Sequence, residues 1–534
     1  MNEEQNEGLT DMPVDLQDVL PDTEPSVDYI AMDDKLRPVT HLLAMCRYQL
    51  ALDRLHQLVA KDTFLPTEMW RVWQRAADCY YGLLDMKKAA ECYWTAIEHT
   101  EGMPYKKQCE FFSNYLFILH YVPDMTSAMM RDRHLLYDAL FRHVELYAHD
   151  PRNPARRHEK IRIGYIAPTF CENILSFFCV QLLTRYDRSR FEVYLYELNG
   201  GKDDLAKDLE RAVTKFRDFT GRELSKDVAQ RIYDDEIDIL FDLAVHTEGG
   251  HTLQVMRYRP APIQMAGIGY MSTSGLGVMD YFLTDIYVDP PGEHDADFSE
   301  ELVRLPHSHF CYTPPERATW SEKVWQLRPD EGVLFASFNN FAKISDHMLL
   351  LWKRILERVP DAKLLLKNGS RCSWFVRRVK DRARALGLPM DRVIFEAPER
   401  LYFDRYKDVD ILLDTYPYVG GGTTCDALFA GVPVISRYGD RHGTRFGLSL
   451  LANVGLAELA AATDDEYVEK AVALAQDREL LTALHESITA RMKASPVMDG
   501  AGYVRDVETA FEVMWQDYLA HGVRTRGEKR RIFV

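Results

Sequence analysis

The amino-acid sequence predicts an α/β protein with two α/β domains and an all-α region in front of them. After residue 160, short apolar runs alternate with amphipathic stretches, which is typical of parallel strands joined by crossover helices. Residues 409–436 read as a strand, a glycine loop, a helix and a second strand. Residues 37–150 carry small and aromatic residues at helical spacings. At 534 residues, two or three domains are expected.

The N-terminal part of the chain divides into a tail and a helical region. Residues 1–36 are acidic and contain three prolines, so we expect a disordered tail and no signal peptide. In residues 37–150, six positions match one tetratricopeptide unit: Trp73, Ala77, Tyr80, Ala89, Tyr93 and Ala96. The small residues let two antiparallel helices approach, and the aromatic residues are expected inside the hairpin. The region is either a repeat that binds a protein partner or a hairpin that packs on the next domain.

The first α/β domain is predicted over residues 160–325, after a proline-containing linker. Apolar runs at 161–166, 191–196 and 237–243 predict strands, and 225–233 predicts a helix. Ligands of parallel sheets bind beyond the carboxyl ends of the strands. Three segments are therefore expected along one edge: 169–176, 246–247 and 269–275.

The second α/β domain is predicted over residues 332–520. Its strands are expected at 333–338, 361–367 and 392–395, followed by the two strands of the 409–436 block. Amphipathic helices at about 464–492 and 504–518 close the domain. The basic residues of 521–534 are expected to form a solvated end of the chain.

The glycine loop of the second domain predicts an anion site. Gly421 and Gly422 let a backbone approach a ligand closely, and a helix that opens there presents free N–H groups. Thr423 and Thr424 can cap that helix or donate to a phosphate oxygen. Asp426, one turn further, can accept from ribose hydroxyls. An ordinary turn and helix cap explains the loop alone about equally well.

Charge and cysteine content limit the partners. Lys and Arg number 65 against 82 Asp and Glu, a net charge of −17 without a long basic run. This balance argues against nucleic acid or an anionic membrane as the main partner. The nine cysteines show no CxxC pair or zinc spacing, and no apolar run is long enough to span a bilayer. These features predict free thiols and a cytoplasmic protein.

Several ordered motifs carry a resemblance to a known family. They are residues 259–264 (RPAPIQ), 269–275 (GYMSTSG), 279–281 (MDY), 335–344 (FASFNNFAKI) and 414–436. Together they resemble the protein O-GlcNAc transferase family, the SPINDLY-like glycosyltransferases, from about residue 161 to about residue 518. The resemblance implies a GT-B arrangement, in which two Rossmann-like domains face each other across a cleft. It also implies an acceptor side in the first domain and a nucleotide-sugar side in the second.

The resemblance assigns further site residues. Lys343 matches the lysine that contacts the diphosphate, and His134 stands where the family often has a histidine facing the cleft. Asn340 and the hydroxyls of Thr273 and Ser274 are candidate sugar or phosphate contacts. Tyr402 also joins the donor-binding set, where the family often has a histidine. No acidic metal motif is visible, so a lysine and backbone N–H groups would have to neutralise the leaving diphosphate, and no cofactor is expected.

Two positions depart from the family pattern. Thr169 and Asn173 stand where the family usually has an aspartate and a histidine, and Gly421 stands where some members have histidine. Neither Thr169 nor Asn173 can act as a base near neutral pH. The leading interpretation is an inverting, metal-independent transferase that moves a sugar, GlcNAc from UDP-GlcNAc, to Ser or Thr of a protein. The alternatives are a scaffold that has lost catalysis, or another GT-B enzyme such as a glucosyl- or fucosyltransferase or an epimerase.

Overall fold

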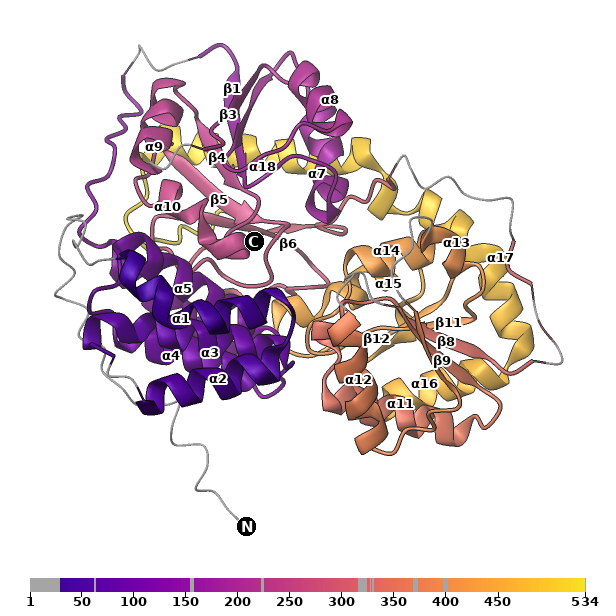
Figure 1. Ribbon diagram of the computed structural model, residues 1–534. Coiled ribbons are helices and arrows are strands. Elements are labelled where there is room, and N and C mark those ends of the chain that lie inside the picture. The colour runs from indigo at the N-terminus through magenta and orange to yellow at the C-terminus, as the bar shows by residue number, and fades with distance from the viewer. Residues whose placement is uncertain are drawn as a thin grey trace.

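The computed structural model describes residues 29–61, 64–153, 158–221, 225–315, 324–326, 328, 331–367, 373–396 and 402–533. It contains an N-terminal helical region and two α/β domains, each built on one parallel sheet (Figure 1). This is the architecture that the sequence predicts. No helix within the described ranges is both long and apolar enough to cross a membrane.

Over its described residues, the helical region contains six α-helices. They are α1 (Tyr29–Ala44), α2 (Tyr48–Lys61), α3 (Met69–Gly82), α4 (Met86–Glu98), α5 (Tyr105–Leu119) and α6 (Ser127–Leu135). Helix α1 begins at Tyr29, earlier than the expected end of the acidic tail at residue 36, and the rest of that tail lies outside the described residues. Asp85 caps α4 by accepting from Lys88 N–H at 3.2 Å.

Helices α3 and α4 form the predicted hairpin. The three small residues Ala77, Ala89 and Ala96 are fully buried, which allows the two helices to approach closely. Tyr93 is buried as expected, whereas Trp73 and Tyr80 are only half-buried. The prediction that all three aromatic residues lie inside the hairpin is therefore correct for one of them. The other two pack at the edge of the core.

The first domain has a seven-stranded parallel sheet in the order β3-β2-β1-β4-β5-β6-β7. Its strands are β1 (Ile161–Ala167), β2 (Phe191–Glu197), β3 (Lys215–Asp218), β4 (Ile239–Asp242), β5 (Ile263–Gly267), β6 (Tyr281–Asp285) and β7 (Glu301–Leu305). Its helices are α7 (Ile174–Thr184), α8 (Asp204–Ala212), α9 (Ser225–Asp234) and α10 (Leu253–Met256). The order reverses at β1, so the edge beyond β1 and β4 is a topological switch point, where ligands of such sheets bind.

The second domain has a six-stranded sheet in the order β10-β9-β8-β11-β12-β13. Its strands are β8 (Leu334–Ser337), β9 (Lys363–Lys367), β10 (Val393–Glu396), β11 (Ile411–Leu413), β12 (Val434–Arg437) and β13 (Ala460–Ala461). Its helices are α11 (Asp346–Arg358), α12 (Ser373–Ala385), α13 (Tyr402–Tyr406), α14 (Gly422–Phe429), α15 (Phe446–Asn453), α16 (Asp464–Gln476) and α17 (Arg478–Ala494). Here the switch point lies between β8 and β11, which carry the predicted lysine loop and the glycine loop.

The last helix, α18 (Gly500–His521), returns to the first domain, as the yellow ribbon in Figure 1 shows. Its Glu508 accepts from Asp187 N–H at 2.7 Å. The residues after α18 are solvated only in part: Thr525, Arg526, Gly527 and Arg531 are exposed as predicted, whereas Arg524 is not. Arg524 is buried and donates to Glu301 Oε2 at 2.8 Å. The basic tail thus neutralises a buried carboxylate at the edge of the first sheet.

The helical region contacts both α/β domains. Toward the second domain, Trp374 and Arg378 of α12 donate to the carbonyl oxygens of Gly82 and Leu83, each at 3.0 Å. Toward the first domain, Ser113 of α5 lies 3.0 Å from His246 Nδ1. The helical region thus packs on both of its neighbours. This contact is what the predicted interpretation of a packing hairpin describes.

Candidate functional site

A cleft of about 880 Å³ lies between the carboxyl edges of the two sheets. The first domain contributes Thr169, Asn173, Thr247 and Glu248, and the second contributes Lys343 and the glycine loop. This volume lies in the usual range for small-molecule sites and fits a nucleotide sugar.

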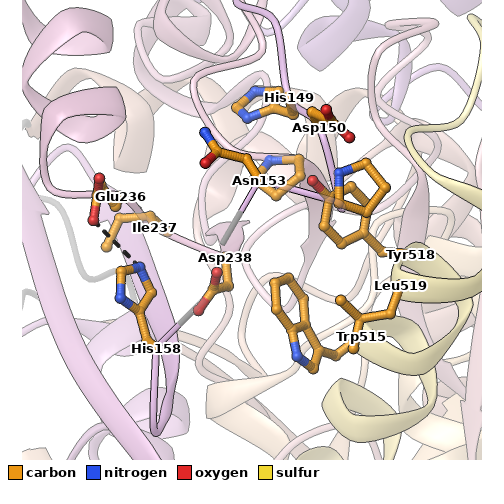
Figure 2. A pocket seen from close by; sticks show the side chains of 12 residues that line it. His149, Asp150, Asn153, His158, Glu236, Ile237, Asp238, Trp515, Tyr518 and Leu519 are labelled. Atoms are coloured by element: carbon orange, nitrogen blue, oxygen red, sulfur yellow. Dashed lines mark ion pairs between the residues drawn. The ribbon is translucent and has the colours of Figure 1, made fainter. Parts of the chain in front are cut away.

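A second pocket lies at the opposite end of the first sheet (Figure 2). There His158 and Glu236 face each other at 3.5 Å, beside Trp515 of α18. Its volume of about 20 Å³ holds little more than a water molecule, so it is too small for the predicted donor.

Lys343 reaches the cleft from a short 3-10 helix that follows β8. Its Nζ donates to the carbonyl oxygen of Val419 at 3.1 Å and lies 3.9 Å from the centre of the Tyr418 ring. Burial lowers the pKa of Lys343 to about 8, and the carboxylate of Asp414 opposes this shift. The ammonium is therefore mostly protonated near pH 7, next to the loop predicted to hold the diphosphate.

The glycine loop is held by the buried carboxylate of Asp414. Its Oδ1 accepts from Gly420 N–H at 2.8 Å and from Asn339 Nδ2 at 3.1 Å. Its Oδ2 accepts from the Ser436 hydroxyl at 2.7 Å. Burial raises the pKa of Asp414, and these hydrogen bonds oppose that shift. The same hydrogen bonds fix the loop between β11 and β12.

Helix α14 begins in this loop and directs its N-terminus to the cleft. Gly421, Gly422 and Thr423 line the cleft there. A side chain at Gly422 would overlap Ile174 of α7, whereas one at Gly421 would meet Phe310 at an ordinary 3.7 Å. Gly422 is therefore needed for the close approach of the two domains, and Gly421 leaves room above the helix N-terminus for an anion.

Thr424 and Asp426 have different surroundings. Thr424 is fully buried and its hydroxyl donates to the Gly420 carbonyl at 2.9 Å, so it stabilises the loop. The prediction was that it contacts the donor, but its hydroxyl is directed to the loop instead. Asp426 lines the cleft, and its Oδ1 accepts from the Tyr312 hydroxyl at 2.6 Å. That contact fixes the carboxylate at the edge of the cleft, as a ribose contact requires.

Thr273 and Ser274 do not contact the cleft, contrary to the prediction. Both are fully buried. The Thr273 hydroxyl donates to Glu300 Oε2 at 2.6 Å, and the Ser274 hydroxyl donates to the other oxygen of the same carboxylate. Their loop meets the cleft through Gly269 and Met271 instead.

Asn340 and Tyr402 complete the predicted donor set. Asn340 is exposed, lines the cleft and caps the short helix by accepting from Ala342 N–H at 3.0 Å. Tyr402 begins α13, but its side chain lies outside the described residues.

His134 is a structural histidine, which corrects the prediction that it is catalytic. It is fully buried, and Nδ1 lies 2.6 Å from the Met130 carbonyl oxygen. Because a carbonyl oxygen only accepts, Nδ1 carries the proton and Nε2 accepts from the Tyr270 hydroxyl at 2.8 Å. Burial lowers the pKa of His134 to about 4, so the ring is neutral at pH 7 and is not among the described cleft residues.

Thr169 and Asn173 lie in the cleft as predicted, and both are already engaged. The Thr169 hydroxyl donates to Glu197 Oε1 at 3.2 Å, and Asn173 caps α7 by accepting from Ser176 N–H at 3.1 Å. They position the loop and provide no basic group.

Sequence reasoning missed several residues of this site, and three of them matter for its chemistry. Phe117 of α5 lines the cleft, so the helical region forms part of its wall. The Tyr418 ring packs against the Nζ atom of Lys343, and Glu248 is part of the cleft wall formed by the first domain. The signals for the last two were an aromatic residue next to the glycine loop and an acid followed by two glycines after a strand.

No group of three or more His, Cys, Asp or Glu side chains in the described segments is arranged to hold a metal ion.

Comparison with known proteins identifies the class. The profile "Glycosyl transferase family 41" matches residues 134–314 and 313–507. A solved mutant of the O-GlcNAc transferase from Thermobaculum terrenum is similar in structure, with a TM-score of 0.80 and 26% identity, covering 92% of this chain and 91% of that one. The chain belongs to glycosyl transferase family 41, and its two parallel-sheet domains form a GT-B fold.

Curated relatives include plant proteins described as "Probable UDP-N-acetylglucosamine--peptide N-acetylglucosaminyltransferase SPINDLY". The one from Hordeum vulgare is 36% identical over 76% of this chain, and the one from Arabidopsis thaliana is 37% identical over 69%. The chain spans only 43% and 40% of their respective lengths.

Proposed function

We propose that this protein is an inverting, metal-independent glycosyltransferase that moves GlcNAc from UDP-GlcNAc to Ser or Thr hydroxyls of a protein acceptor. The observation that carries the proposal is the placement of Lys343 beside the N-terminus of α14 in a cleft of about 880 Å³. The names of the plant relatives support the choice of donor and of a peptide acceptor. The reaction is proposed to take place in the cytoplasm.

The proposed reaction balances within the cleft. The acceptor oxygen forms a bond to the anomeric carbon while the bond from that carbon to the phosphate oxygen breaks. The electron pair leaves on the diphosphate, where Lys343 and the free N–H groups of α14 stabilise the charge. The acceptor proton passes to the departing phosphate, because Thr169 and Asn173 offer no base.

The other donor contacts follow from the wall of the second domain. Asp426 would accept from the ribose hydroxyls, with its orientation held by Tyr312. Thr423 and Asn340 would donate to phosphate or sugar oxygens, since both line the cleft. Nucleic acid and membranes are not proposed as partners, and the N-terminal helices are a proposed surface for a protein partner.

The test compares the wild-type protein with Lys343→Ala and with Lys226→Ala, a change at an exposed lysine of α9 outside the cleft. UDP release from UDP-GlcNAc and mass spectrometry of lysate proteins are measured for all three. We expect added hexosamine with the wild type and Lys226→Ala, and little with Lys343→Ala. If none of the three transfers sugar while the wild type still binds UDP, the scaffold alternative is correct.

A further inference from the structure

Glu248 is an exposed carboxylate in the wall that the first domain gives to the cleft. It follows β4, and the neighbouring polar residues on this wall, Thr169, Asn173 and Thr247, are neutral. The other carboxylate among the described cleft residues is Asp426, which is nearly buried, accepts from Tyr312 and belongs to the opposite wall. Glu248 is therefore the charged group that an acceptor meets on the first-domain side.

The backbone holds Glu248 in this position. Glu248 has φ 48° and ψ 43°, and Gly249 and Gly250 follow with φ of 75° and 67°. A non-glycine residue in this left-handed region is strained and persists only where its surroundings enforce it. A side chain at Gly250 would overlap Ser113 Oγ, and one at Gly249 would meet Glu110 Cγ at 2.9 Å. Helix α5 thus packs directly on this turn, which holds the backbone of Glu248 at the cleft.

The charge of Glu248 is not neutralised by the described residues around it. No described lysine, arginine or histidine lies within 4.0 Å of its carboxylate. Lys107 of α5 is paired with Glu110 at 2.7 Å. Burial lowers the pKa of His251 although the carboxylates of Glu110 and Glu248 oppose this shift, so that ring is neutral at pH 7. The chain as a whole carries −17, which adds to the attraction for cations.

We propose that Glu248 selects acceptors that carry a lysine or arginine close to the modified Ser or Thr. The proposal rests on the proposed function, because the acceptor is taken to enter along the first-domain wall. A cationic segment gains an ion pair there, whereas an acidic segment meets a like charge. The donor contacts lie on the opposite wall, so the preference concerns the acceptor alone.

The experiment uses the full chain, UDP-GlcNAc and three peptide pools in which Ser and Thr are flanked by Lys, Gln or Glu. The variants are Glu248→Gln, Glu248→Lys and the control Glu486→Gln, which removes the same charge from an exposed site on α17. We expect kcat/KM of the wild type and of Glu486→Gln to favour the Lys pool over the Glu pool by about five- to tenfold. Glu248→Gln should bring this ratio close to one, and Glu248→Lys should reverse it.

Two further readouts separate selection from damage. UDP affinity should be the same in all four proteins, and the preference of the wild type should weaken with added salt because the pair is exposed. Equal transfer to all three pools by the wild type, or an unchanged preference in Glu248→Gln, would overturn the inference alone. Absence of transfer to every pool would overturn the proposed function and this inference with it.

Discussion

At the scale of single residues, the site depends on one partly buried ammonium. Lys343 loses part of its hydration in the cleft, and this lowers its pKa to about 8. The same surroundings strengthen its attraction to an incoming diphosphate, since charge interactions grow as water is excluded. The Val419 carbonyl and the Tyr418 ring fix the position of the Nζ atom before any ligand arrives. The lysine therefore needs little rearrangement to stabilise charge on a leaving group.

Replacing this ammonium should weaken nucleotide binding. Lys343→Ala removes a charge-assisted hydrogen bond worth about 1.5–3 kcal/mol, so UDP affinity should fall by roughly 10- to 150-fold. Isothermal titration calorimetry with UDP measures the change, and Lys226→Ala provides the control. A folded Lys343→Ala variant with wild-type UDP affinity would contradict the assignment.

The same residue predicts a pH dependence. Below pH 8 Lys343 is protonated and attracts the diphosphate, and above pH 8 it loses the proton and the attraction. UDP affinity should therefore decline between about pH 7.5 and 9.5, by up to about tenfold per pH unit at the alkaline end. Titrations across this range test the effect. The decline must be absent in Lys343→Ala, and the same slope in both proteins would assign it to another group.

At the scale of elements, the cleft is built by helix ends and turns that converge from all three parts of the chain. Helix α7 brings Ile174 against Gly422 at the start of α14, which joins the two sheets at their carboxyl edges. Helix α5 brings Phe117 into the cleft wall, and the turn that follows it places Tyr121 against Tyr418, with 5.0 Å between the ring centres. Lys343 thus rests on a ring that the helical region supports.

This support should be measurable in turnover. Tyr121→Ala leaves a void behind Tyr418, so Lys343 should lose its fixed position and kcat should fall by about tenfold. Tyr121→Phe keeps the ring contact and should stay within about twofold of the wild type. Thermal unfolding of both variants checks that the fold persists. Equal turnover in Tyr121→Ala and Tyr121→Phe would show that α5 does not position the lysine.

At the scale of the whole molecule, the sequence predicts the architecture well because its signals are local. The buried strand β11 is a continuous apolar run, and the glycine loop is visible in the printed sequence. The directions of side chains depend instead on distant partners. Ser274 was predicted to contact the ligand, but its hydroxyl donates to Glu300, which is distant in sequence. His134 was predicted to be catalytic, but its Nε2 accepts from the equally distant Tyr270.

Besides side-chain directions, contacts between distant parts of the chain could not be predicted from the sequence. Nothing local indicates that the basic tail brings Arg524 to Glu301, or that α18 returns to the first domain. The role of Glu248 was missed for a related reason, since a glycine-rich turn predicts a loop but not the wall that the loop faces. Tertiary packing decides these directions, and local propensity does not encode it.

The helical region should be required for a stable, ligand-binding protein. Removing residues 1–157 would uncover the fully buried Tyr270 and His246 and the aromatic rings of Tyr418 and Trp374, which pack on α2, α3, α5 and α6. Large apolar surface of this kind drives association, so the truncated chain should be less soluble and bind UDP weakly. Size-exclusion chromatography and UDP titration measure both effects. A shorter deletion of residues 1–28 is the matched control and should behave like the full chain, because it leaves these contacts intact. A soluble chain starting at residue 158 with wild-type UDP affinity would show that the two α/β domains form the donor site without the helices.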